Sequence, residues 1–141
     1  MTFNRSLFKS ERTNWGTPSK FYKELDKEFH FTFDPCPLKK PDWDGLQRTW
    51  HGRVFVNPPY GRTITMWIRK AIVECSIRMN CEVCVMLLPS RTDTKWWHDL
   101  VMEYGTEIRF IRGRLRFRGA RSSAPFPSCV VIFRAGKRPT F

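Results

Sequence analysis

The chain has 141 residues, of which 41% are hydrophobic and 15% aromatic, a composition typical of a globular domain and not of a disordered chain. Its net charge is +12, from 25 lysines and arginines against 13 acidic residues, which favours a polyanionic partner such as nucleic acid. No apolar run approaches membrane-spanning length, and residues 1–12, expected to be a loose arm, lack the apolar core of a signal peptide. We therefore expect a single cytoplasmic domain over residues 1–141, without a membrane partner.

Cysteine and histidine usage gives no sign of a metal centre. Five cysteines at irregular spacing indicate free thiols in a reducing compartment, and Cys81 and Cys84 have the two-residue spacing of half a zinc site. No second half follows, and the sequence contains no phosphate-binding glycine loop, nucleophile elbow or helical pair of metal ligands. We therefore expect no metal ion.

Helical and extended patterns alternate along the chain. Thr17 and Pro18 suit the N-cap and the first position of a helix. The predicted elements are, in order, a helix over residues 19–28, strands over 29–33 and 54–56, a helix over 64–79, a strand over 84–88, a helix over 95–104, and strands over 107–111 and 128–134. We expect residues 113–117 to continue as an extended ribbon and residues 118–127 to form a long loop. This order predicts an α/β fold whose sheet is mostly parallel, with a C-terminal antiparallel hairpin.

The most informative stretch follows the strand over residues 54–56 and reads Asn57-Pro58-Pro59-Tyr60. Prolines lack a backbone N–H, so this turn offers carbonyl acceptors, and the residues before them stay extended. The side-chain oxygen of Asn57 and the carbonyl of Pro58 can then accept from one planar amine, with the Tyr60 ring beside it as a stacking surface. Holding both hydrogens localises the nitrogen lone pair and aims it at an electrophile. The alternative is that the prolines merely end a strand and open a turn.

Basic residues dominate the C-terminal third, where no acidic residue follows Glu107. Alternate arginines in an extended ribbon would lie on one face and could hold the phosphates of DNA. The arginines predicted to do so are Arg112, Arg114, Arg116, Arg118 and Arg121. The alternative is a solvated edge that keeps the chain soluble.

The motifs of the chain together resemble a known family. They are Trp15-x-Thr17-Pro18, Phe33-Asp34-Pro35, Asp44-Gly45-Leu46-x-x-x-Trp50, Val54-Phe55-Val56-Asn57-Pro58-Pro59-Tyr60-Gly61, Trp67-Ile68-x-Lys70-Ala71, Leu87-Leu88-Pro89 and Arg112-Gly113-Arg114-x-x-Phe117. In this order, over residues 14–133, they are similar to the phage-type, Dam-like DNA N6-adenine methyltransferases. These are short amino-methyltransferases found in phages and prophages.

The resemblance implies a reduced Rossmann-like class I methyltransferase fold, S-adenosylmethionine as methyl donor, and a flipped-out adenine of double-stranded DNA as acceptor. It also implies a phage or restriction-modification setting. By resemblance, the catalytic residues that hold the amine and stack on the adenine are Asn57, Pro58, Pro59 and Tyr60. The residues that the resemblance assigns to the cofactor are Trp15, Thr17, Pro18, Asp34, Pro35, Asp44 and Asn57.

The chain departs from the wider superfamily after its first predicted strand. Asp34-Pro35 is not followed by a glycine-rich turn, and only about twenty residues separate this strand from the one before Asn57, which leaves no room for the usual intervening strands and helices. The cofactor pocket is therefore expected to be reduced or to be completed by other elements. Two alternatives stay open: an N-methyltransferase acting on RNA or on a protein glutamine, and a DNA-binding module that has lost cofactor use.

Overall fold

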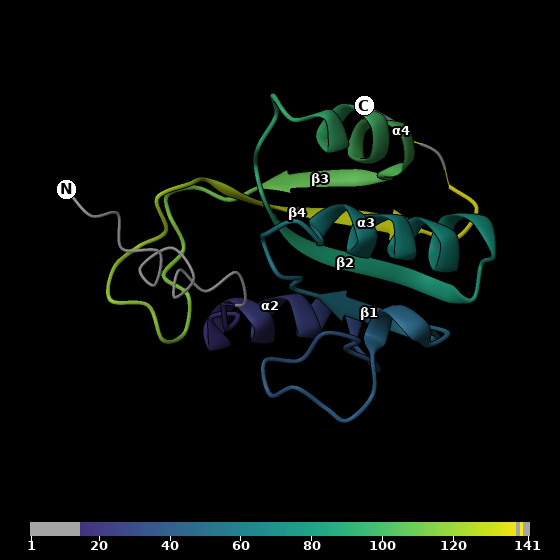
Figure 1. Cartoon of the computed structure of the whole chain (residues 1–141), viewed down its shortest axis with the longest axis horizontal. Helices are drawn as coiled ribbons and strands as arrows, with labels where there is room; N and C mark the ends of the chain where they lie inside the picture. Colours follow the sequence, from purple (N-terminus) through teal and green to yellow (C-terminus); the bar gives the residue numbers. More distant parts are fainter. Residues whose placement is uncertain (1–14, 138, 140–141) are drawn as a thin grey trace.

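The computed structural model of the chain describes residues 15–137 and 139, so the arm predicted over residues 1–12 lies outside the described part. A four-stranded sheet flanked by helices forms its centre (Figure 1). The elements are, in chain order, α2 (Ser19–Phe29), the 3-10 helix η1 (Gly45–Gln47), β1 (Gly52–Val56), α3 (Ile64–Ala71), the π-helix η2 (Ile72–Ile77), β2 (Cys81–Pro89), the π-helix η3 (Trp97–Val101), α4 (Met102–Tyr104), β3 (Glu107–Phe110) and β4 (Ser128–Arg134).

The sheet is mixed, with the strand order β1-β2-β4-β3. β1 pairs with β2 in parallel, whereas β4 is antiparallel to both of its neighbours, β2 and β3. β1, β2 and β3 therefore point in one direction, and a parallel bridge from Phe33 to Val54 adds the preceding chain beside β1. The predicted α/β architecture and the antiparallel pair at the C-terminal end are confirmed. The pairing itself is not mostly parallel, because β4 inserts between β2 and β3.

Side chains alternate between the two faces of the sheet, as the two-residue period of a strand requires. In β1, Val54 and Val56 belong to a buried cluster that α3, η2 and η3 cover. Phe55 belongs to a second cluster on the opposite face, which α2 and residues 111–127 cover. Figure 1 shows α3 in front of the sheet. Since both faces are buried, β2 is apolar along almost its whole length, as the sequence indicated.

The strand predicted over residues 29–33 is wrong. α2 continues through Phe29, which is 5% exposed and packs in the same cluster as Phe55. The helix ends at His30, whose φ of 53° is left-handed and whose N–H donates to the Asp26 carbonyl. Extended pairing with β1 is limited to an isolated bridge at Phe33, and residues 30–32 between the helix and this bridge form neither helix nor strand.

The other helices lie close to their predicted positions, with two differences. Pro18 and not Thr17 is the N-cap of α2, which begins at Ser19 without a side-chain cap. The segments predicted as single helices over residues 64–79 and 95–104 each contain a π-helical stretch, η2 and η3. Apolar periodicity cannot distinguish this wider turn from an α-helix, because both present one apolar face to the sheet.

The ribbon predicted over residues 113–117 does not form a strand. β3 ends at Phe110, and residues 111–127 run as a long loop to β4, projecting beyond the arrowhead of β3 (Figure 1). Within this loop an isolated antiparallel bridge joins Arg118 to Gly16, so the middle of the loop pairs with the segment before α2.

Candidate active site

Polar side chains from distant parts of the sequence meet at one edge of the sheet. Phe33 and β1 run in the same direction as β2, so Asp34, Asn57 and Ser90, which follow their carboxyl ends, lie at the same edge. The loop over residues 111–127 starts from this edge as well, at the end of β3. In open α/β sheets this is the edge where ligands bind.

Asn57 is buried, with 6% exposure, and its side-chain amide has a fixed orientation. The Nδ2 group donates to the backbone carbonyl of Trp15 at 2.6 Å and to the Oγ1 atom of Thr17 at 3.1 Å. A carbonyl oxygen can only accept, so the amide nitrogen and not the amide oxygen must face Trp15. The segment before α2 therefore holds the Asn57 amide.

The Oδ1 atom of Asn57 is buried and has no hydrogen-bond partner among the described residues. Leaving such an acceptor unpaired costs about 1–3 kcal/mol, so buried acceptors are rarely left in this state. An amine donated by a ligand would satisfy the atom, which is the role predicted for Asn57. The carbonyl of Pro58, expected to accept the second hydrogen, and the neighbouring Pro59 keep their roles as predictions.

Tyr60 forms one wall of an aromatic cavity. Its hydroxyl donates to the Leu87 carbonyl at 2.8 Å, and burial raises the pKa of this phenol well above its usual value, so it stays neutral. The ring packs edge-on against Phe117 and Phe126, with centroids 6.0 and 5.7 Å away. The cavity of about 380 Å³ is lined by Trp15, Tyr60, Arg91, Phe117 and residues 120–126. Its size and apolar walls suit a flat aromatic ligand.

Thr17, two residues after Trp15, lines a second cavity of about 250 Å³. The lining residues are Thr17, Ser19, Tyr22, Lys23, Asp34, Pro37, Leu38, Phe55 and Arg118, so the walls carry both signs of charge. The Asp34 carboxylate accepts from the Cys36 N–H at 2.8 Å. Burial nevertheless raises the pKa of Asp34 to about 6, because the single hydrogen bond offsets only part of the desolvation.

Pro35 and Asp44 lie outside the lining of this second cavity. The Asp44 carboxylate accepts from the Leu46 N–H at 2.9 Å and caps η1. A Cβ atom on Gly45 would collide with the Pro35 carbonyl oxygen, and the Trp50 indole donates to the Gly45 carbonyl at 2.8 Å. The motif from Asp44 to Trp50 thus locks the loop against Pro35. The cofactor contacts assigned to Pro35 and Asp44 stay predictions.

Trp15 and Pro18 do not line the second cavity, and the cofactor contacts assigned to them stay predictions. Trp15 lines the aromatic cavity and not the cavity of Asp34, with its ring 6.5 Å from that of Phe117. Pro18 is the N-cap of α2, and its carbonyl accepts from the Tyr22 N–H at 3.0 Å. Of the residues assigned to the cofactor by resemblance, the second cavity therefore brings together Thr17 and Asp34.

The arginines predicted to contact DNA all have exposed side chains, whereas Leu115 and Phe117 between them are half-buried and buried. The predicted alternation therefore appears in the exposure pattern, although the backbone forms no strand. These arginines are Arg112, Arg114, Arg116, Arg118 and Arg121. Arg121 also lines the aromatic cavity and Arg118 the second cavity. Contact with DNA stays a prediction for all of them.

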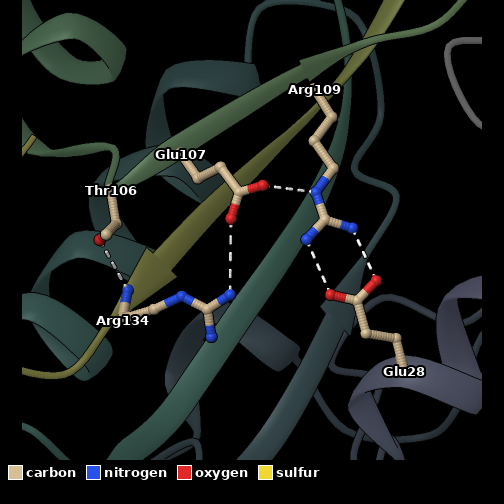
Figure 2. Close-up of polar contacts among 5 residues, drawn as sticks. All are labelled: Glu28, Thr106, Glu107, Arg109 and Arg134. Carbon is tan, nitrogen blue, oxygen red and sulfur yellow. Dashed lines mark hydrogen bonds and ion pairs between the residues drawn. The ribbon is translucent and has the colours of Figure 1, made fainter. Parts of the chain in front are cut away.

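Arg109 begins the same arginine run but serves the fold. Its guanidinium donates twice to the Glu28 carboxylate, at 2.7 Å each, and once to Glu107 at 2.6 Å (Figure 2). Arg134 also contacts Glu107, at 3.5 Å. This network joins α2 to β3 and β4. It uses three of the five N–H donors of Arg109 and pairs the guanidinium with two carboxylates, so Arg109 is not a candidate for phosphate contact.

Within residues 15–137 and 139, no three or more His, Cys, Asp or Glu side chains gather as metal ligands. No helix in that part of the chain has the length and apolarity needed to cross a membrane.

Comparison with protein families decides the class of enzyme. The model of Dam, DNA N-6-adenine-methyltransferase, matches residues 4–140. The chain belongs to this family. No curated protein and no solved structure matches it. The protein is thus a DNA N6-adenine methyltransferase, and adenine in DNA is the acceptor among those that the Asn-Pro-Pro-Tyr motif left open.

Two charged residues of this Dam-family site were not predicted from the sequence. Arg91 lines the aromatic cavity, with its guanidinium carbon 5.7 Å from the centroid of the Phe126 ring. It lies two residues beyond the end of β2, a position comparable to that of Asn57 after β1, and this could have marked it. Lys23 lines the second cavity from α2. It lies one helical turn after Ser19, but the sequence alone does not show which face of α2 meets a cavity.

Proposed function

We propose that this Dam-family enzyme transfers a methyl group from S-adenosylmethionine to the N6 amine of an adenine turned out of double-stranded DNA. The observation that carries the proposal is the buried Oδ1 atom of Asn57, which has no hydrogen-bond partner among the described residues. The Asn57 amide is held by the segment before α2. In this segment Trp15 lines the aromatic cavity and Thr17 lines the second cavity. We further propose that the sheet is a reduced Rossmann-like class I methyltransferase fold. The gathering of both cavities at the carboxyl ends of the strands supports this assignment.

The aromatic cavity would receive the adenine. Its ring would stack on Tyr60, while Asn57 Oδ1 accepts one N6 hydrogen and the Pro58 carbonyl accepts the other. Two acceptors on one amine localise its lone pair, which is otherwise delocalised into the ring, and orient it for in-line attack. The hydrogen bond from Tyr60 to Leu87 fixes the ring before the base arrives, so little ordering is needed on binding.

The second cavity fits the amino-acid part of the cofactor. S-adenosylmethionine, when bound, supplies a methyl group on a positively charged sulfur. Its amino-acid part carries an ammonium and a carboxylate group, and the lining offers the Asp34 carboxylate for the first and the Lys23 and Arg118 cations for the second. The Thr17 and Ser19 hydroxyls add neutral hydrogen-bonding groups. Because this cavity is small, the adenosine part would extend beyond it, toward the loop fixed by Asp44.

Four of the exposed arginines of the loop, Arg112, Arg114, Arg116 and Arg121, would hold DNA phosphates around the flipped base, with salt-dependent affinity, whereas Arg118 lines the second cavity. The net charge of +12 supports a polyanionic substrate. We also propose that the enzyme works in the bacterial cytoplasm, as a phage or restriction-modification methyltransferase. This setting is the one that the resemblance implied.

The test is methylation of plasmid DNA with labelled S-adenosylmethionine, followed by mapping of the modified base. We expect Asn57→Ala and Tyr60→Ala to lower the rate by about a hundredfold or more, as removal of groups that act in the transition state does. Asn80→Ala and Tyr104→Ala are matched controls. Asn80 also donates its amide within the protein, to Glu74 at 2.6 Å. Asn80 and Tyr104 lie before the amino ends of β2 and β3, at the edge of the sheet opposite Asn57 and Tyr60. Unchanged activity in both test variants would contradict the assignment.

A further inference from the structure

Arg118 differs from the other exposed arginines of its loop in how its backbone and side chain are held. Its N–H donates to the Gly16 carbonyl at 2.8 Å, within the antiparallel bridge between these residues. A Cβ atom on Gly16 would lie 2.8 Å from the Arg118 Cβ and 3.5 Å from its Cδ. The aliphatic part of Arg118 therefore lies across the bare backbone of Gly16, a close approach that only glycine permits.

This placement makes Arg118 a wall of the second cavity, together with Asp34 and Thr17. The other four exposed arginines of residues 112–121 do not line this cavity. An arginine that sequence pattern assigns to the DNA surface is thus positioned, in the structure, beside the polar cavity proposed for the cofactor.

The charges of the cavity are separated and do not neutralise one another. Among the described residues, no ion pair joins Arg118 or Lys23 to Asp34. Burial raises the pKa of Asp34 to about 6, and no neighbouring cation offsets this desolvation. A ligand that carries an ammonium group and a carboxylate group would pair with the Asp34 carboxylate and with a cation of the cavity at the same time.

We propose that Arg118 binds the carboxylate of the cofactor's amino-acid part, opposite an ammonium group held by Asp34. The proposal rests on S-adenosylmethionine being the cofactor. A guanidinium matches a carboxylate with two parallel hydrogen bonds, which favours Arg118 over the point charge of Lys23. The cofactor cavity, which lacks the usual glycine-rich turn, is then completed by the loop that carries the DNA-facing arginines.

The experiment compares two ligands by isothermal titration calorimetry with the full chain: S-adenosylhomocysteine, and its decarboxylated analogue, which keeps the ammonium group. We expect Arg118→Gln to weaken binding of S-adenosylhomocysteine about tenfold to a hundredfold, as loss of a charge-assisted hydrogen bond does, and to leave the analogue unchanged. Arg118→Lys should recover part of the affinity. Arg116→Gln, at an exposed arginine that lines neither cavity, should change neither ligand.

Non-specific DNA binding supplies the second readout. We expect Arg118→Gln to leave the salt dependence of DNA affinity unchanged, whereas an arginine that contacts phosphate lowers the slope by about one when it is removed. Thermal unfolding shows whether the variant keeps its fold.

Three results would overturn the role of Arg118: equal weakening of both ligands, weakening of neither, or a carboxylate-selective loss in Lys23→Gln but not in Arg118→Gln. A wild-type protein that binds neither ligand, with or without DNA, would instead refute the proposed cofactor. The two failures are therefore distinguishable.

Discussion

Replacing Asp34 by asparagine should make the protein more stable while it weakens the cofactor site. The carboxylate lies in a cavity where burial raises its pKa to about 6, and its single hydrogen bond within the protein comes from the Cys36 N–H. The asparagine side chain has nearly the same shape as that of aspartate, and its Oδ1 atom can accept the hydrogen bond from the Cys36 N–H. The substitution therefore removes a desolvated charge and keeps the local turn.

The size and the sign of the effect follow from the pKa of Asp34. The difference between the ordinary value of 3.8 and about 6 corresponds to about 3 kcal/mol. Because the folded protein keeps this proton to a higher pH than the unfolded chain does, the wild type loses stability as the pH rises from about 4 to about 6. The variant carries no titrating group there. The free energy of unfolding of the variant should exceed that of the wild type only slightly near pH 4. The difference should reach up to about 3 kcal/mol at pH 7–8, or several degrees in Tm.

The assay is urea unfolding of both proteins between pH 4 and pH 8, with calorimetric titration of S-adenosylhomocysteine at pH 8. Asp44→Asn is the matched control, since Asp44 also caps a backbone N–H but lies exposed outside the cavity, and it should change stability by about 0.5 kcal/mol or less. We expect the Asp34 variant to bind the ligand at least about tenfold more weakly. A stability difference that does not vary with pH, or a variant less stable at pH 8, would refute the reasoning.

Three further substitutions separate structural from functional roles. Tyr60→Phe should keep most of the methylation activity, because the ring remains, but should cost about 1–2 kcal/mol in urea unfolding, because the Leu87 carbonyl loses its donor; a loss of activity as large as in Tyr60→Ala would contradict this. Gly45→Ala should destabilise the protein by about 1–3 kcal/mol in the same measurement, since its Cβ collides with the Pro35 carbonyl, and wild-type stability would show that this loop can move. Arg109→Gln breaks a half-exposed network and should cost about 1 kcal/mol or less without changing the salt dependence of DNA binding; a lower salt slope would place this arginine on DNA.

The core of the sheet could be predicted from sequence because its strands are continuously apolar and bounded by turn residues. The last strand, residues 128–134, was predicted with the bounds that β4 has. The strand predicted over residues 29–33 failed because an aromatic run suits a buried helix end as well as a strand. Only the tertiary contact of Phe29 with the sheet decides between them. The placement of β4 between β2 and β3 depends on long-range pairing, which local periodicity does not contain.

The site was predictable where it depends on a strand end and not where it depends on a loop. Asn57 and Tyr60 follow a recognisable strand and a turn of fixed chemistry, so their position at the sheet edge could be inferred. The Asn57 amide donates hydrogen bonds to Trp15 and Thr17, which lie about forty positions earlier in the chain. No sequence periodicity predicts such a contact. Likewise, the side on which the Arg118 side chain lies is set by a bridge to Gly16, which sequence alternation could not reveal.

The long loop between β3 and β4 has both ends on neighbouring strands: Phe110 pairs with Cys129, and the Ile111 N–H donates to the Ser128 carbonyl at 3.1 Å. It therefore leaves the sheet and returns to it at one place. Lengthening it would disturb no register, and each doubling of a loop costs only about 0.6 kcal/mol. Arg112, Arg114 and Arg116 are exposed positions of this loop that line neither cavity, so they can change without disturbing the packing of Phe117 and Ala124 on the sheet. The part of the loop that is predicted to face DNA could therefore change in sequence while the walls of both cavities stay as they are.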